Sequence, residues 1–104
     1  MKSFNLFIDD CKTPMVEFSG THSEVPDTSW VIARNVDDAK TLLSTGMVKD
    51  LAIDNDLGLG ETGYDIMKWL ENNKEYWPSG IITCVSNNPI GRENIMAVIK
   101  RNIK

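Results

Sequence analysis

The sequence predicts an α/β fold, a small doubly wound parallel sheet of about four strands in the order 2-1-3-4. The first observation behind this prediction is that short apolar runs alternate with segments of helical periodicity, a pattern typical of parallel strands joined by right-handed crossovers. The second is the length of 104 residues, which is enough for one core and which we expect to form a single domain over residues 1–104.

Composition limits the classes of function. Hydrophobic residues make up 41% and charged residues 25% of the chain, which is ordinary for a soluble globular domain. The net charge of −4 argues against broad, non-specific DNA binding, because such binding depends on neutralising phosphates. No apolar run approaches the ~20 residues that cross a bilayer, and two cysteines are too few for a secreted disulfide scaffold. We therefore expect a cytoplasmic protein that does not contact the membrane.

The first strand is predicted at residues 4–8, because the run is short, apolar and rich in Phe, Leu and Ile. Residues 11–29 contain two prolines, a glycine and many polar residues without a helical period, and they predict a long loop. Two interpretations of this loop stay open, a lid over the edge of the sheet and a surface crossing without a role. The second strand follows at residues 30–33.

Helices and strands then alternate. Asn35 predicts the N-cap of the first helix, and Gly46 predicts its end. A third strand is expected at residues 51–54. Thr62, followed by Asp65 three residues later, resembles a capping box and predicts the start of the second helix.

Asn72, Asn73 and Pro78 predict the end of the second helix, before a fourth strand at residues 81–85. Asn88 is a natural N-cap for the last helix, because Pro89 fits the first helical position that follows.

Four aspartates follow two of these strands. Asp9 and Asp10 come after the first strand, and Asp54 and Asp56 come after the third. The carboxyl ends of parallel strands share the edge where α/β folds place ligands, and carboxylates that converge there repel one another unless a cation or a proton intervenes. Such oxygen donors suit Mg²⁺ or Mn²⁺. The alternative is that these acids only solvate loops and cap helices, but two clusters beside the switch point favour a metal or phosphate site.

A polar segment from Ser86 to Arg92 follows the fourth strand. It offers a hydroxyl group, the amides of Asn87 and Asn88, a helix N-terminus that presents N–H groups to an anion, and the Arg92 guanidinium. The alternative is that Asn88 only caps the helix and Arg92 is solvated. Next to the acidic residues, this segment favours phosphate binding.

Three motifs together resemble one known family, the cyclic-phosphate-processing receiver-like domains, over nearly the whole chain. These motifs are Ile8-Asp9-Asp10 with Pro14, Ile53-Asp54-Asn55-Asp56-Leu57-Gly58 with Thr62-Gly63-Tyr64-Asp65, and Ser86-Asn87-Asn88-Pro89-Ile90-Gly91-Arg92-Glu93-Asn94-Ile95-Met96. The resemblance implies a variant of the response-regulator receiver fold. It also implies a role in processing or recognising cyclic phosphates on nucleotides or RNA ends.

The motifs assign roles to the residues at the predicted edge. The predicted metal ligands are Asp9, Asp10, Asp54 and Asp56, the predicted catalytic residues are Asp54, Asp56 and Ser86, and the predicted phosphate-binding residues are Lys12, Asn87, Asn88 and Arg92. The sequence departs from the family at three positions, where Asn55 and Val85 replace histidines and Lys12 replaces an arginine. General acid–base catalysis typically contributes ~10²–10⁴-fold, so binding survives the loss of both histidines more readily than turnover does.

Three functions are therefore open. The first is a metal-dependent phosphoesterase acting on a cyclic phosphate, and the second is a binding module for a nucleotide, an RNA end or a protein partner. The third is a receiver switch phosphorylated on Asp54, which is less favoured because no fifth strand with its lysine is predicted. A missing fifth strand also leaves the edge of the fourth strand uncovered, and such an edge favours pairing into a homodimer.

Overall fold

The strands of the protein form one parallel sheet in the order β2-β1-β3-β4. The structure is a computed structural model, and it describes residues 3–10 and 30–102. Its elements, in chain order, are β1 (Phe4–Ile8), β2 (Trp30–Ala33), α2 (Val36–Leu43), β3 (Val48–Ile53), α3 (Gly63–Glu71), the 3-10 helix η3 (Lys74–Tyr76), β4 (Ile82–Cys84) and α4 (Pro89–Asn102). The predicted strand order and parallel pairing are confirmed.

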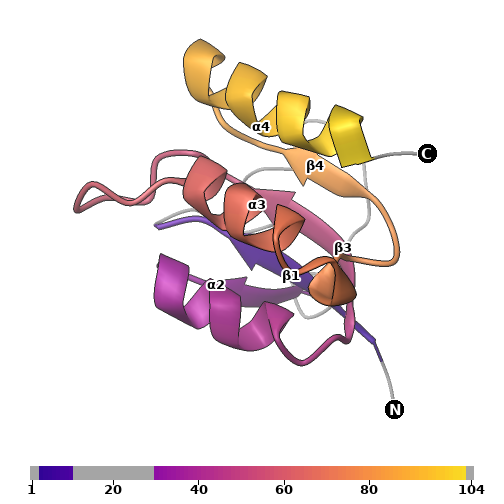
Figure 1. The fold of residues 1–104 in the computed structure, drawn as a ribbon. Helices are drawn as coiled ribbons and strands as arrows, with labels where there is room; N and C mark the ends of the chain where they lie inside the picture. Colours follow the sequence, from indigo (N-terminus) through magenta and orange to yellow (C-terminus); the bar gives the residue numbers. More distant parts are fainter. Residues whose placement is uncertain (1–2, 11–29, 103–104) are drawn as a thin grey trace, which may run out of the picture.

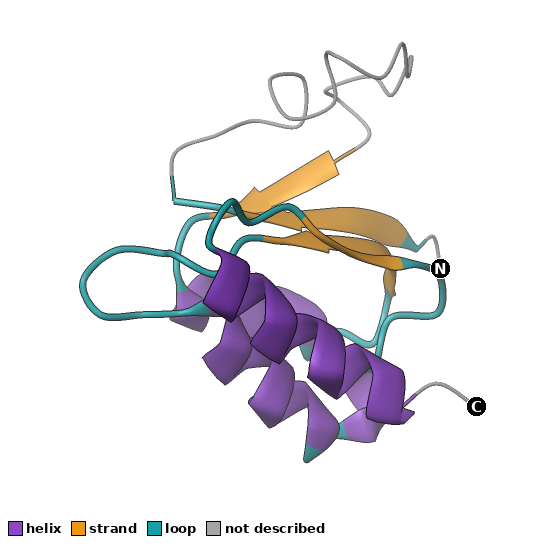
Figure 2. Cartoon of the chain, turned by 90° about the horizontal axis from the view of Figure 1, so that it is seen from above, coloured by secondary structure: helices purple, strands orange, loops and turns teal. Residues whose placement is uncertain are grey.

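The helices α2, α3 and α4 lie on the same face of the sheet (Figure 1, Figure 2). They bury the main core against alternate side chains of the central strands, among them Leu6 and Ile8 of β1 and Leu51 and Ile53 of β3. None of the described helices is long and apolar enough to span a membrane.

The opposite face of the sheet has a smaller apolar cluster. It consists of Phe7, Ala52 and Val85, with Trp30 and Ile32 packed against it. These side chains alternate with those of the main core along the strands, so they point away from the helices. No described helix covers this face, so the second helix layer of a doubly wound sheet is absent from the described part of the chain. The predicted loop or lid at residues 11–29 lies outside the described residues.

The predicted helix caps are confirmed. The side-chain oxygen of Asn35 accepts a hydrogen bond from the Asp38 N–H at 2.8 Å, and the Thr62 hydroxyl accepts one from the Asp65 N–H at 3.1 Å. The Asn88 side chain accepts from two N–H groups in the first turn of α4, each at 3.1 Å. After α2, Gly46 takes the left-handed conformation (φ 72°) that glycine adopts without strain. Local side-chain chemistry therefore sets where α2, α3 and α4 begin.

The ends of two strands differ from the prediction. β3 begins at Val48 rather than at residue 51, because Val48 pairs with Phe4 and the register shifts before Leu6. β4 covers only Ile82–Cys84, although the backbone of its two neighbours, Ile81 and Val85, still bonds to β3. Polar residues inside β3 interrupt its apolar run, so the sequence pattern did not predict pairing before residue 51.

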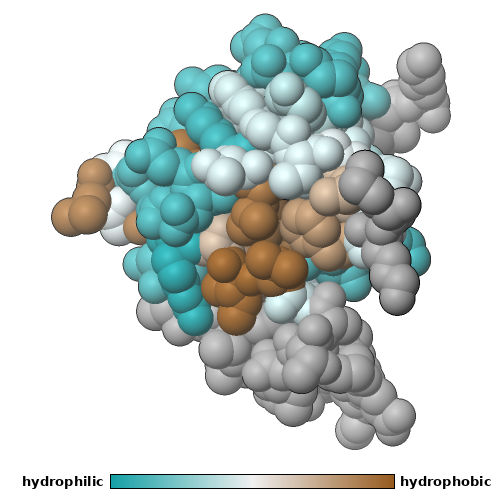
Figure 3. Space-filling view, turned by 90° about the horizontal axis from the view of Figure 1, so that it is seen from below, coloured by the Kyte–Doolittle hydropathy of each residue, from teal (hydrophilic) through white to brown (hydrophobic). Residues whose placement is uncertain are grey.

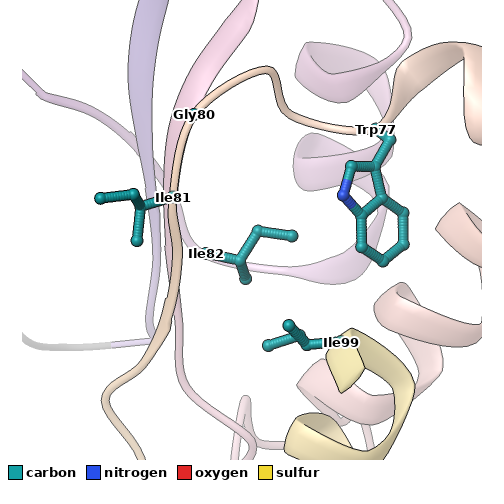
Figure 4. A pocket seen from close by; sticks show the side chains of 5 residues that line it. All are labelled: Trp77, Gly80, Ile81, Ile82 and Ile99. Atoms are coloured by element: carbon teal, nitrogen blue, oxygen red, sulfur yellow. The ribbon is translucent and has the colours of Figure 1, made fainter. Parts of the chain in front are cut away.

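Both edges of the sheet have apolar surface. A cavity of about 230 Å³ beside β4 is lined by Trp77, Gly80, Ile81, Ile82 and Ile99. Figure 4 shows Trp77, Ile82 and Ile99 around this cavity, with Ile81 on the other side of the strand. At the other edge Val31 is exposed, and the view from the α2 side shows an apolar patch (Figure 3). The homodimer expected from the β4 edge stays a prediction.

An ion pair joins the far ends of α3 and α4. Glu71 accepts hydrogen bonds from Arg101 at 2.6 and 2.8 Å and from the Asn102 amide at 2.7 Å. These contacts, first those of Arg101 and then that of Asn102, lower the pKa of Glu71 from 4.5 to about 2.

A carboxyl group whose pKa is lowered by folding stabilises the protein above its unfolded pKa, and this contribution disappears as the pH falls through the folded pKa. We therefore expect Glu71→Gln to flatten the dependence of the free energy of unfolding on pH between about 5 and 2. The effect should be small, because the pair is exposed to solvent and salt. Urea unfolding across this range measures it, with Glu93→Gln, an exposed glutamate of α4, as the control. Equal slopes for wild type and Glu71→Gln would contradict the prediction.

Candidate functional site at the carboxyl edge of the sheet

Three carboxylates meet where β1 and β3 end. One oxygen from each of Asp9, Asp10 and Asp54 lies within 4.8 Å of the others. The Asp9 N–H donates to the Ala33 carbonyl at 3.1 Å, and the Asp54 N–H donates to the Ile8 carbonyl at 2.9 Å. Asp9 and Asp54 are therefore held by the last rungs of the parallel ladder and are buried, whereas Asp10 is exposed.

This group has the donors that a hard divalent cation prefers. Mg²⁺ binds carboxylate oxygens at 2.0–2.1 Å, so two oxygens on opposite sides of one ion lie about 4.2 Å apart. Carboxylates within 4.8 Å of one another need only small side-chain rotations to reach that spacing. Without a cation or a proton, three such groups repel one another. The three residues therefore fit an ion such as Mg²⁺ or Mn²⁺.

Asp56, the fourth predicted ligand, does not join this group. Its carboxylate is exposed and lies 3.4 Å from the side-chain amide nitrogens of Asn55 and Asn88. The chain has left β3 by this point, because the backbone of Asp56 forms an antiparallel bridge with Thr62. Asp56 therefore links the loop after β3 to the loop after β4.

The loop after β4 places the predicted phosphate-binding residues at the same edge. The Ser86 hydroxyl is buried and accepts a hydrogen bond from the Asn88 N–H at 3.0 Å. Asn87 is exposed, and the guanidinium of Arg92 donates to the Cys84 carbonyl at 2.9 Å. Arg92 is thus held at the carboxyl end of β4, while Lys12 lies outside the described residues.

Asn55 connects three segments around the site. Its carbonyl accepts the Gly63 N–H at 2.8 Å, and its side-chain oxygen lies 3.4 Å from the Tyr64 N–H. A Cβ atom at Gly91 would overlap the Asn55 side chain, so α4 approaches this residue as closely as a glycine allows. The sequence does not by itself predict this packing of Asn55, although glycines in the first turns of two helices are a signal of such close contacts.

Val85, the other position that departs from the family, lies in the apolar cluster on the helix-free face. It is 8% exposed and packs with Phe7 and Ala52. An imidazole at this position would lose its contacts with water. Position 85 therefore contributes to packing in this chain.

Cys84 is a core residue. It is 4% exposed, and burial raises the pKa of its thiol. A thiol that stays protonated is a poor nucleophile. Within the described residues, the chemistry of this edge therefore rests on carboxylates, amides, a hydroxyl and a guanidinium.

The comparisons with known proteins agree with this geometry. The model of the cyclic-phosphate processing receiver domain family matches residues 4–101, nearly the whole chain. No curated protein and no solved structure matches the chain. The parallel sheet, the acidic group at its carboxyl edge and the family match together show that the chain belongs to the cyclic-phosphate processing receiver domain family.

Proposed function

We propose that this domain binds Mg²⁺ or Mn²⁺ together with a nucleotide or RNA end that carries a cyclic phosphate, and that it hydrolyses this phosphate. The observation that carries the proposal is the convergence of the Asp9, Asp10 and Asp54 carboxylates within 4.8 Å. Membership in the cyclic-phosphate processing family supports the class of ligand.

The residues at the carboxyl edge of the sheet have separate roles in this function. Asp9, Asp10 and Asp54 hold the ion, which when bound neutralises charge on a phosphoryl oxygen and polarises it. Arg92 and the amide of Asn87 bind the phosphate from the side of β4. Asp56, which is exposed, takes a proton from the water that attacks phosphorus and returns it to the ribose oxygen that is released when one P–O bond of the ring breaks. Ser86 orients the loop that carries Asn88.

A second candidate function is a binding module with little or no turnover. It is favoured by the places of Asn55 and Val85, which pack against Gly91 and Phe7 where the family pattern has histidines. Neither side chain titrates near neutral pH, so neither replaces a histidine as an acid or base. Binding and turnover are therefore measured separately.

Phosphorus NMR of a panel of 2′,3′-cyclic and 3′,5′-cyclic nucleotides, each with protein and the diamagnetic ion Mg²⁺, separates the alternatives. New phosphomonoester signals would support the phosphoesterase. Bound but unchanged nucleotide would support the binding module. If no nucleotide of either series binds in the presence of the ion, the proposed function is wrong.

Arg92→Ala is expected to weaken the binding of a cyclic nucleotide by ~1.5–3 kcal/mol, the range for a hydrogen bond to a charged group. The macrodipole of α4 already favours an anion at this end of the helix. Isothermal titration of wild type and variant with the same nucleotide measures the change. The matched control is Lys100→Ala, which removes an exposed cation from the last turn of the same helix. Equal affinities for wild type and Arg92→Ala would mean that Arg92 only supports the end of β4.

A further inference from the structure

Arg34, the first residue after β2, lies at the carboxyl edge beside the acidic group. Its guanidinium donates a hydrogen bond from Nη1 to the main-chain carbonyl of Asp9 at 3.2 Å. The N–H of Asp9 donates in turn to the carbonyl of Ala33 at 3.1 Å. Both main-chain polar groups of Asp9, one of the three carboxylate residues, are therefore bonded to the end of β2.

The hydrogen bond to Asp9 limits how far the guanidinium lies from the carboxylates. The carbonyl and the carboxylate of one aspartate are joined by only a few bonds, so Nη1 of Arg34 lies within about 9 Å of the Asp9 carboxylate. Ion–oxygen bonds are about 2.1 Å long, and hydrogen bonds from a guanidinium to a phosphate are about 2.8 Å long. A chain of one ion, one phosphoryl group and one hydrogen bond therefore has a similar length.

A second guanidinium is anchored on the other side of the acidic group. Nη1 of Arg92 donates to the carbonyl of Cys84, the last residue of β4, at 2.9 Å. In the sheet β2 is the neighbour of β1 and β4 is the neighbour of β3, and neighbouring strands lie about 4.8 Å apart. The acidic group at the ends of β1 and β3 therefore has one anchored guanidinium towards β2 and one towards β4.

The charges of these groups favour an anionic ligand only when both arginines are counted. Three ionised carboxylates and one divalent ion leave a net charge of about −1, which repels a phosphate. Two guanidinium groups change the sign of this net charge. A guanidinium has five N–H donors in a planar fork, so a hydrogen bond to a carbonyl does not prevent one to a phosphate oxygen.

We propose that Arg34 is a second phosphate-binding residue, which holds the phosphoryl group of the ligand from the side of β2 while Arg92 holds it from the side of β4. This inference rests on the proposed function, and it adds a residue that binds the phosphate but not the ion. The alternative is that Arg34 only holds the main chain of Asp9 in place. The two roles differ in their effect on the affinity for the ion.

The test is isothermal titration of Arg34→Gln with Mg²⁺ alone and with 2′,3′-cyclic AMP in the presence of Mg²⁺. Nucleotide binding should weaken about 10- to 100-fold, the effect of losing a hydrogen bond to a charged group. Where the nucleotide is hydrolysed, its KM replaces the dissociation constant. The affinity for Mg²⁺ alone should stay the same or increase, because the glutamine amide keeps a donor for the Asp9 carbonyl and the variant lacks a positive charge near the ion.

Two further variants serve as controls. Arg34→Lys keeps the positive charge without the planar fork, and it should recover part of the nucleotide affinity. Arg101→Gln makes the same substitution at an arginine that pairs with Glu71 at the far ends of α3 and α4. It should leave the affinities for the nucleotide and for Mg²⁺ unchanged, and the melting temperatures of all variants show whether they are folded.

The outcomes separate this inference from the proposed function. If the wild type binds the nucleotide and folded Arg34→Gln binds it equally well, the inference alone is overturned. A loss of Mg²⁺ affinity as large as the loss of nucleotide affinity would also overturn it, because Arg34 would then act only through Asp9. A wild type that binds Mg²⁺ but no nucleotide would overturn both the inference and the proposed function.

Discussion

Mg²⁺ or Mn²⁺ is expected to raise the melting temperature of the wild-type protein, and Asp54→Asn is expected to remove most of that rise. An ion that binds only the folded state stabilises it by about 2.7 kcal/mol at about 100 times its Kd. For a domain of this size that corresponds to about 10–20 °C. Asp54 is the buried member of the group that β3 supplies, so its loss removes a ligand that the exposed Asp10 cannot replace.

Without the ion, Asp54→Asn should be at least as stable as the wild type. Asparagine keeps an oxygen that can accept the Asn55 N–H, which now donates to Asp54 at 2.8 Å, but it removes one of three mutually repelling charges. Asp54→Asn in EDTA is therefore expected to melt at or above the temperature of the wild type.

The matched control is Asp56→Asn, the same substitution two residues away on a carboxylate outside the group. It should keep the rise caused by the ion. Thermal unfolding of the three proteins with EDTA, Mg²⁺ and Mn²⁺ gives the comparison. Equal ion-induced rises in melting temperature in wild type and Asp54→Asn would refute the metal site. If Asp56→Asn also loses this rise, Asp56 is a fourth ligand of the ion.

Gly63→Ala is expected to destabilise the protein by about 3 kcal/mol, the upper end of the usual range for overpacking a buried site. A Cβ atom there would overlap the main-chain carbonyl oxygen of Asp54 and lie 2.9 Å from the Ile53 side chain. A backbone carbonyl directly after a paired strand cannot rotate away as a side chain can. The start of α3 or the end of β3 must therefore move, and the ion-induced rise in melting temperature should fall as well.

Gly60→Ala separates this overlap from the general cost of replacing a glycine. Nothing lies within 4 Å of a Cβ atom at Gly60, and only its φ of 78° opposes the substitution, at a cost of about 1 kcal/mol. Urea unfolding of both variants measures the difference. If Gly63→Ala is no less stable than Gly60→Ala, the close packing of α3 on Asp54 does not require a glycine at position 63.

The amino-acid sequence is sufficient to predict the topology of the sheet and which residues follow its strands at the carboxyl edge. The apolar runs at 4–8 and 30–33 became β1 and β2, and Asn35, Thr62 and Asn88 became helix caps, because these signals act within a few residues of the chain. Parallel pairing then brought Asp9 and Asp54 to one edge, as expected for neighbouring strands.

Which carboxylates meet depends on the three-dimensional fold and cannot be predicted from residue spacing. A spacing of two residues in extended backbone predicts that Asp54 and Asp56 point the same way, but β3 ends at Ile53 and the chain turns, so Asp56 faces amides instead. β1 likewise ends at Ile8, which lets the adjacent Asp9 and Asp10 reach the same group.

Residue spacing also does not predict the packing of Asn55 against Gly91 and of Val85 against Phe7. These contacts join residues more than 30 positions apart, and no local pattern specifies them. They depend on how closely α4 approaches the end of β3 and on which face of the sheet each side chain meets. That is decided when the helices and strands pack together, because side-chain volumes from distant segments must then fill the same space.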